Sequence, residues 1–344
     1  MKLFCYTFIL CLFTHVSCYA ENTLYSITLQ GAIGPVYKDF FERGLQTAIE
    51  NKADGFILEL DTPGGLDSSM RTIIKTILAS PIPIICYVSP SGGRAASAGT
   101  YILYASHIAA MAPGTNVGSA TPITLGQPKS FPSTKENDTQ KTSSSKLENK
   151  MINDAIAYIE GLANLRKRNS QWAKKAVKEA ANISAEEALR KNVIDIVATD
   201  KQVLIKQIIE KRSIPLSPNP TIIHISPDWK TKLLSKITQP DIAYMLFIAG
   251  IYCLIIELSN PGLIVPGITG SIALILALYG LNILPISWIG LSLILIGILL
   301  LIAELFVTTF GLLGLTGTGI FILGSIMLIE PNELGLNIST TLIM

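Results

Sequence analysis

The C-terminal part of the chain constrains its fold more than any other feature. From Ile242 to Met344 the sequence is dominated by apolar residues and contains no Lys or Arg. Its apolar stretches are each close to the ~20 residues that a helix needs to cross a bilayer, and Pro-Gly, Leu-Pro and Phe-Gly turns separate them. We therefore expect helical spans joined as hairpins, at Ile242–Leu258, Ile264–Leu284, Ile286–Val307 and Leu312–Ile329.

Two carboxylates, Glu257 and Glu304, lie inside or near the ends of these apolar stretches. A charge within a bilayer is expensive, so each carboxylate needs a specific environment. One interpretation has them line a cavity or contact a partner helix. The other, which we favour, places them near the interface, where they cap helix ends or hydrogen-bond to Ser259 or Thr308.

The N-terminus is typical of a secretory signal. Lys2 supplies a positive residue, Leu3–Phe13 an apolar core, and Cys18-Tyr-Ala a plausible cleavage site before Glu21. A lipoprotein signal at Cys18 and an uncleaved anchor are the alternatives. A signal exports the domain that follows it, so we expect that domain on the periplasmic or extracellular face.

Three lysines argue for the opposite topology. Lys230, Lys232 and Lys236 lie just before the first apolar stretch, and cytoplasmic flanks usually carry such residues. We favour export because the hydrophobic N-terminus resembles a signal and the next domain begins directly after it.

Charge and cysteine usage limit the classes of partner and the kinds of site that we expect. The net charge is only +2 and no basic tract is present, so nucleic acid is not an expected partner. Three of the five cysteines belong to the signal, and we expect Cys86 and Cys253 never to meet. The sequence therefore implies no disulfide framework, no metal site and no cofactor.

Between the signal and the apolar region, short apolar runs alternate with helix-like stretches. Gly55–Asp61 and Ile82–Val88 are typical strands, and Leu66–Leu78 between them is a helix pattern. This alternation predicts a largely parallel sheet flanked by helices. We expect a signal at 1–20, a soluble α/β domain at 21–200, a linker at 201–240, a membrane domain at 241–330 and a tail at 331–344.

Two further local patterns stand out in the soluble part. Thr124–Lys146 is polar and has no apolar period, which predicts a surface loop. Ser184 followed by Glu187 forms a capping box that opens a helix.

The first motif with chemical meaning is Asp61-Thr-Pro-Gly-Gly-Leu, at the end of a predicted strand. Paired glycines allow a tight turn whose N–H groups point outward, as an oxyanion hole requires. A Gly-Gly turn between a strand and a helix is also common as a purely structural feature, so this motif alone is weak.

The second motif surrounds Ser97, which lies between alanines and glycine at the start of a predicted helix, Arg94–Tyr104. Small neighbours leave room for a substrate carbonyl, and the Ala98 N–H at the helix N-terminus can donate to an oxyanion. We predict Gly65 and Ala98 as oxyanion donors, and Gly64 and Gly99 as substrate contacts. The alternative is a helix whose small residues only permit close packing.

The third motif is Lys150, at the start of the predicted helix Lys150–Leu165. A serine nucleophile needs a base, and a lysine can serve when burial in an apolar pocket disfavours its charged form. A lysine at a helix start is more often a solvated surface residue.

A Ser-His-Asp triad is the rival arrangement. His15 belongs to the signal and His224 to the expected linker, so His107 is the one serious candidate. His107 follows Ser97 closely, at the edge of a predicted strand, where a packed side chain is more usual than a base. A Ser-Lys pair is a recognised variant of the same chemistry.

These motifs together resemble a known family. LDTPGGL, AASAGTYILYASHIAAMAPGTNVGSATPI, KMINDAIAYIEGLA and, in the apolar region, AELFVTTFGLLGLTG are similar to the NfeD family of membrane-bound ClpP-class serine proteases. The likeness extends over residues 23–200 and into the membrane region. It implies a ClpP/crotonase-like spiral fold, with Ser97 as nucleophile, Lys150 as base and Gly64–Gly65 as the oxyanion turn.

The resemblance also implies partners and a location. It predicts ATP-independent cleavage of an apolar segment of a stomatin-like (SPFH) membrane protein, a homo-oligomer, and a multi-pass protein of the bacterial inner (plasma) membrane. Longer members carry an OB-fold domain after the membrane region, and from the position of Met344, soon after the fourth predicted span, we expect no such domain here. Two other functions stay open: a crotonase-like acyl-CoA enzyme, and a non-catalytic membrane scaffold for stomatin-like assemblies.

Overall fold

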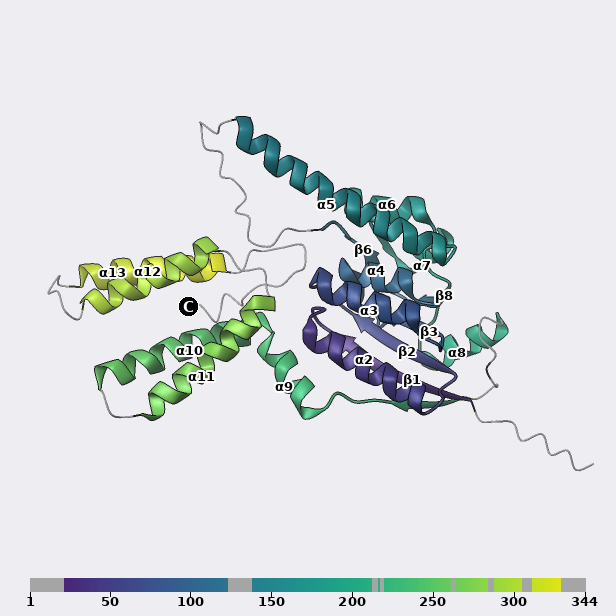
Figure 1. Ribbon diagram of the computed structural model, residues 1–344, viewed down its shortest axis with the longest axis horizontal. Helices are drawn as coiled ribbons and strands as arrows, with labels where there is room; N and C mark the ends of the chain where they lie inside the picture. Colours follow the sequence, from purple (N-terminus) through teal and green to yellow (C-terminus); the bar gives the residue numbers. More distant parts are fainter. Residues whose placement is uncertain are drawn as a thin grey trace, which may run out of the picture.

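An α/β domain is followed by a short helix and two pairs of apolar helices (Figure 1). The predicted signal at 1–20 and the tail at 331–344 lie outside the described residues, as does most of the predicted polar loop. This computed structural model describes residues 22–122, 138–211, 216, 220–260, 264–283, 288–304 and 311–328.

A six-stranded sheet forms the centre of the α/β domain, in the order β8-β5-β3-β2-β1-β9. Every neighbouring pair is parallel, which confirms the predicted class. The carboxyl ends of the strands therefore meet at one edge of the sheet. The strands are β1 (Thr23–Gln30), β2 (Gly55–Asp61), β3 (Ile84–Val88), β5 (Ile108–Met111), β8 (Ile196–Val197) and β9 (Thr221–His224).

Alternate strand residues build a separate core on each face of the sheet, as the pleat requires. In β2, for example, Leu58 packs into one core and Ile57 into the other. The larger core includes the helices α2 (Pro35–Glu50), α3 (Asp67–Ala79) and α4 (Ala98–Ala105), whereas α8 (Lys201–Glu210) covers the opposite face.

A second, three-stranded sheet lies beside the carboxyl end of β2. It has the order β4-β6-β7, formed by β4 (Arg94–Ala96), β6 (Asn116–Gly118) and β7 (Asn182–Ser184). Its neighbours are α5 (Asp138–Leu165), α6 (Ser170–Lys178) and α7 (Ala185–Arg190). Ser184 caps α7 by accepting from the Glu187 N–H at 3.4 Å, which confirms the predicted cap.

The structure differs from the expected organisation at two places. Residues 201–240, treated above as a linker, contain α8, β9 and α9 (Trp229–Ile237), and β9 is the edge strand beside β1. Tertiary pairing with β1 recruits this short strand, which its own sequence pattern did not reveal. In addition, α5 begins at Asp138 rather than at Lys150. Elongation of an existing helix adds one hydrogen bond per residue, so it can continue through a polar segment.

The apolar region forms two helical hairpins, one of α10 (Pro240–Ser259) with α11 (Val265–Ile283) and one of α12 (Trp288–Glu304) with α13 (Leu312–Leu328). They correspond to the four predicted spans. Among the described residues, only Asp241–Ser259 is both long and apolar enough to cross a bilayer, and the other three helices are apolar but shorter.

The two hairpins repeat the same design. The spacing from Gly250 to Gly270 recurs from Gly297 to Gly317, and in each pair a Cβ built on the first glycine would lie about 3 Å from the carbonyl oxygen of the second. Close helix contact therefore requires glycine at these positions.

A carboxylate occupies the same place in both hairpins. Glu257 accepts from the N–H groups of Ile264 and Gly267 at 3.2 and 3.3 Å. Glu304 accepts from those of Gly311 and Gly314 at 2.8 and 3.2 Å. Both carboxylates thus bind N–H groups at the start of the following helix, which confirms the capping interpretation.

Candidate active site

The turn after β2 is held in place by the segment that follows β1. The Ile33 N–H donates to the Gly64 carbonyl at 2.7 Å, and the Leu66 N–H donates to the Ile33 carbonyl at 2.8 Å. Gly65 lies between these bonds with φ +154°, and a Cβ there would lie 2.1 Å from the Ile33 oxygen. The close approach of two backbones therefore requires glycine at position 65.

Thr62 connects this turn to the strand that precedes Ser97. Its buried hydroxyl accepts from the Gly64 N–H at 3.0 Å and donates to the Gly64 carbonyl at 2.9 Å. Its main chain bonds to β4, through Thr62 N–H to Arg94 O at 2.7 Å and Ala96 N–H to Thr62 O at 3.0 Å. The Gly64–Gly65 turn is thereby fixed beside the strand that leads into Ser97.

Ser97 occupies a sharp turn between β4 and α4. Its backbone has φ 51° and ψ −116°, a conformation that a residue with a Cβ adopts only under strain. The Ser97 N–H donates to the Gly118 carbonyl at 3.0 Å, which helps to hold the turn. Strained serines at strand-to-helix turns are the nucleophiles of several hydrolases, and Ser97 remains partly exposed here while Ala96 and Ala98 are buried.

The two predicted oxyanion donors lie on either side of this arrangement. Ala98 is the first residue of α4, whose N–H has no acceptor within the helix. Among the described residues, neither the Ala98 N–H nor the Gly65 N–H donates a hydrogen bond to another group. Both are thus available to an incoming oxygen, and the positive end of the α4 dipole favours negative charge there.

The two predicted substrate contacts, Gly64 and Gly99, have structural contacts of their own. Both main-chain groups of Gly64 are hydrogen-bonded, as described above. A Cβ on Gly99 would lie 2.6 Å from the Thr62 methyl carbon, so glycine lets α4 approach the turn. A role of either residue in substrate binding stays a prediction.

Lys150 is exposed to solvent on α5, not enclosed in the apolar pocket that the sequence analysis expected. Figure 1 shows the N-terminal part of α5 extending beyond the sheet, so fewer elements surround it. One turn later α5 is held to the domain. Asp154 accepts from Arg71 of α3 at 2.5 Å, and Tyr158 stacks on Tyr101 of α4 at 6.1 Å. The pairing of Lys150 with Ser97 stays a prediction.

His107 lies at the other end of α4 from Ser97, after a helix of about 12 Å. Its Nδ1 accepts from the Ile84 N–H at 3.2 Å, at the amino edge of the sheet. Burial, together with the nearby guanidinium groups of Arg166 and Arg168, lowers the pKa of His107 to about 4. It is a packed side chain, as predicted.

Arg168 supports α4, the helix that begins directly after Ser97, a role that the sequence did not reveal. It is buried, and its Nη1 donates to the Leu103, Tyr104 and Ser106 carbonyls at the C-terminus of α4, at 2.9–3.2 Å. Its Nη2 donates to Asp195 at 2.6 Å. A cation at this end satisfies free carbonyls and complements the helix dipole. Only a polar Arg-Lys-Arg run marks the residue in the sequence.

Comparison with known proteins identifies the family. Residues 241–344 match the model of the NfeD integral membrane domain, and residues 23–135 match that of the NfeD1b N-terminal domain. The chain is 38% identical to the membrane-bound protease PH1510 of Pyrococcus horikoshii over 323 residues, which is 91% of this chain and 70% of that protein. The chain belongs to the NfeD family.

A second NfeD relative, the membrane protein NfeD1b of Bacillus subtilis, is 29% identical over 88% of this chain and 66% of its own length. Two solved structures similar to this NfeD chain are variants of a membrane-bound stomatin-specific protease. A serine-to-alanine variant has a TM-score of 0.51 and 34% identity, covering 61% of this chain and all of the other.

A lysine-to-alanine variant of the same protease, in complex with a substrate peptide, has a TM-score of 0.54 and 35% identity, covering 63% of this chain and 98% of the other. The soluble domain of this NfeD protein therefore has the fold of a membrane-bound protease, as predicted.

Proposed function

We propose that this protein is a membrane-bound serine endopeptidase in which Ser97 is the nucleophile and Lys150 the base. The observation that carries the proposal is the strained turn of Ser97, fixed by Thr62 beside a Gly-Gly turn with an available N–H. Similarity to a membrane-bound protease over most of the chain supports it. The soluble fold of that protease has been solved with a serine and with a lysine replaced.

The proposed reaction is acyl transfer to serine followed by hydrolysis. The amine of Lys150 accepts the proton of the Ser97 hydroxyl as the oxygen attacks a peptide carbonyl, and the N–H groups of Gly65 and Ala98 bind the resulting oxyanion. The proton then passes to the leaving amine, and water hydrolyses the ester. Each oxyanion donor is expected to contribute about 3 kcal/mol to lowering the barrier.

The exposure of Lys150 adds a requirement to this mechanism. A lysine can take a proton from serine when burial in an apolar pocket disfavours the charged form of its amine. Proton transfer therefore requires that bound substrate, or a second copy of the chain, covers Lys150 and desolvates it. Self-association of the protease domain is part of this proposal.

For the substrate, we propose an apolar segment of a stomatin-like (SPFH) membrane protein, because the solved neighbour is described as stomatin-specific. For the location, we propose a bacterial plasma membrane with the protease domain on its outer face. A signal at 1–20 belongs to the same proposal.

A serine-reactive fluorophosphonate probe tests the proposed chemistry. The full chain should be labelled, and Ser97→Ala should lose both labelling and peptide cleavage. Lys150→Ala should lose cleavage, whereas His107→Ala should retain it. Equal cleavage by wild type and Ser97→Ala would reject the peptidase mechanism.

The exposed position of Lys150 favours one alternative, a membrane scaffold that organises stomatin-like assemblies without catalysis. The probe separates the two functions, because a scaffold without catalysis should not be labelled at Ser97. No observation in the structure favours the acyl-CoA enzyme.

A further inference from the structure

The helix α9 lies directly before the first apolar helix, and one of its faces exposes large apolar side chains, which is unusual for a soluble domain. Trp229 is 70% exposed and Leu233, one turn later, is 49% exposed. Lys230, Lys232 and Lys236 are exposed beside them. Large apolar side chains bordered by lysines are typical of helices that lie in a bilayer interface, and Trp is enriched there.

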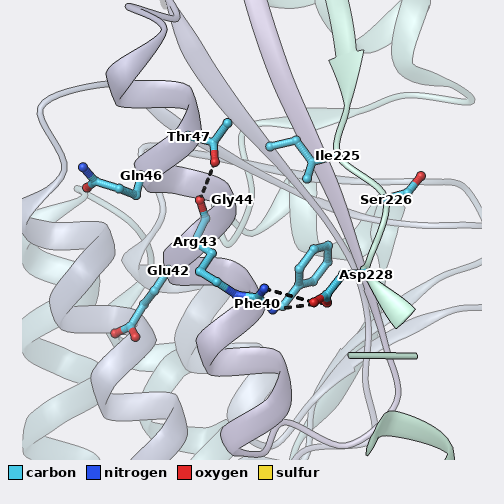
Figure 2. Close-up of a pocket in the computed structure, with 9 residues that line it drawn as sticks. All are labelled: Phe40, Glu42, Arg43, Gly44, Gln46, Thr47, Ile225, Ser226 and Asp228. Carbon is cyan, nitrogen blue, oxygen red and sulfur yellow. Dashed lines mark hydrogen bonds and ion pairs between the residues drawn. The ribbon is translucent and has the colours of Figure 1, made fainter. Parts of the chain in front are cut away.

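The opposite side of α9 is clamped to α2. Thr231 is buried and its hydroxyl accepts from Arg43 Nη2 at 2.8 Å. Arg43 also contacts both carboxylate oxygens of Asp228, at 3.3 and 3.4 Å (Figure 2). Asp228 in turn caps α9 by accepting from the Thr231 N–H at 3.2 Å. A hydrogen bond from the Thr231 hydroxyl to Asp228, followed by the hydrogen bonds from Arg43 and from the Thr231 N–H, lowers the pKa of Asp228 to about 2.

The clamp is local, because a groove of about 670 Å³ separates the neighbouring parts of α2 from the chain that enters α9. Figure 2 shows this groove between Thr47 and Gln46 on α2 and Ile225 and Ser226 on the other side. The few contacts of Arg43, rather than a continuous apolar interface, therefore determine how α9 meets this surface.

From its contacts with Arg43, which we call the clamp, α9 runs toward the edge of the sheet that carries the Gly64–Gly65 turn and Ser97, which we call the catalytic edge. Arg43 lies in the middle of α2, and Tyr37, whose hydroxyl lies near the Ser235 side chain of α9, lies in its first turn. The Tyr37 hydroxyl also donates to the Gln30 carbonyl, directly before the segment whose Ile33 holds Gly65. Ser235 of α9 therefore lies near Tyr37, whose hydroxyl contacts the start of the segment that holds Gly65.

The first membrane helix follows at once. From Ser235 to the start of α10 at Pro240 the rise is about 8 Å at 1.5 Å per residue. A Cβ on Gly280 of α11 would lie 2.6 Å from the Ile237 carbonyl oxygen, so the end of α9 is packed closely against the first hairpin. The catalytic edge and the membrane entry are thus held at a short and fixed separation.

We propose that α9 lies in the interface of an anionic bilayer and positions the catalytic edge at the membrane surface, so that cleavage is directed to the segment of a membrane protein that borders the bilayer. The occupant of the exposed face is lipid, because α9 leads directly into a membrane helix and its lysines complement anionic headgroups. The consequence for cleavage rests on the proposed peptidase function.

The lipid contact is tested by Trp229 fluorescence. The full chain with W172F and W288F, which leaves Trp229 as its sole tryptophan, is reconstituted into phosphatidylcholine vesicles with and without phosphatidylglycerol. Brominated lipid should quench Trp229 strongly, and more so with phosphatidylglycerol. An emission maximum typical of water, with no quenching in either vesicle, would overturn the lipid contact.

The positioning is tested with single-span substrates that carry one cleavable sequence at graded distances from the bilayer. Wild type should cut only the copies closest to the membrane. R43M combined with T231V should cut the distant copies at least severalfold faster, while a soluble peptide is cut at the wild-type rate. L189S, which alters an exposed leucine elsewhere in the soluble domain, should behave as wild type.

The outcomes separate this inference from the function on which it rests. If no version cuts the soluble peptide, the peptidase function itself fails. If all versions cut the peptide and the clamp variant keeps the wild-type distance profile, the peptidase function holds and the positioning role of α9 is wrong.

Discussion

The hydroxyl of Thr62 bonds to both main-chain groups of Gly64, accepting from the N–H at 3.0 Å and donating to the carbonyl at 2.9 Å. Because the Thr62 main chain also pairs with β4, this one residue sets the position of the oxyanion turn relative to Ser97. Oxyanion donors act only when they are placed within a few tenths of an ångström, so the bond should matter for rate.

Thr62→Val should therefore lower kcat for peptide cleavage about tenfold or more with little change in KM, which corresponds to about 1.4 kcal/mol. Thr62→Ser keeps the hydroxyl and should restore most of the rate. Thr115→Val removes another buried threonine hydroxyl, one that bonds to Ala112, and serves as the control for stability. Equal losses in Thr62→Val and Thr115→Val would assign Thr62 a structural role only.

Gly65→Ala should unfold the site. The new Cβ would lie 2.1 Å from the Ile33 carbonyl oxygen at a φ of +154°, so the backbone must move. We expect a loss of more than about 2 kcal/mol in unfolding free energy together with loss of fluorophosphonate labelling. Gly161→Ala lies on α5 with open space around it and should stabilise by up to about 1 kcal/mol. Thermal unfolding of both variants measures the contrast.

Ser97→Gly should raise stability while abolishing activity. Relief of strain at φ 51° contributes about 1–3 kcal/mol, and the greater freedom of glycine in the unfolded chain offsets about 0.5–1 kcal/mol of that. A melting temperature above that of wild type is the expected result. A lower melting temperature would mean that the turn does not strain Ser97.

Acid should destabilise the soluble domain through His107. Its pKa is lowered from 6.5 to about 4 in the folded state, so the folded protein binds fewer protons there than the unfolded chain. The resulting stability is present above pH 6.5 and is lost as the pH falls toward about 4. Urea unfolding across this range should show a smaller decline in His107→Gln than in wild type. An equal decline in the unfolding free energy of both proteins would contradict this role of His107.

Local patterns in the sequence were sufficient to predict those parts of the structure that depend on neighbouring residues. The alternation of strands and helices, the Ser184 cap, the helical hairpins and the capping role of Glu257 and Glu304 all follow from patterns within a few turns of chain. The Gly-Gly motif and the setting of Ser97 between small residues were recognised in the same way, because tight turns impose their demands on adjacent residues.

Contacts between distant segments were decided by the tertiary structure. Pairing of β9 with β1 extends the sheet into residues expected as a linker, Ile33 holds Gly65, and Arg168 caps α4, the helix that follows Ser97. Lys150 is exposed, although its place in the motif predicted burial. Burial and long-range hydrogen bonds depend on which segments pack against each other in the folded chain. The sequence of one segment shows its own polarity and hydrogen-bonding groups, but not which distant segment it will contact.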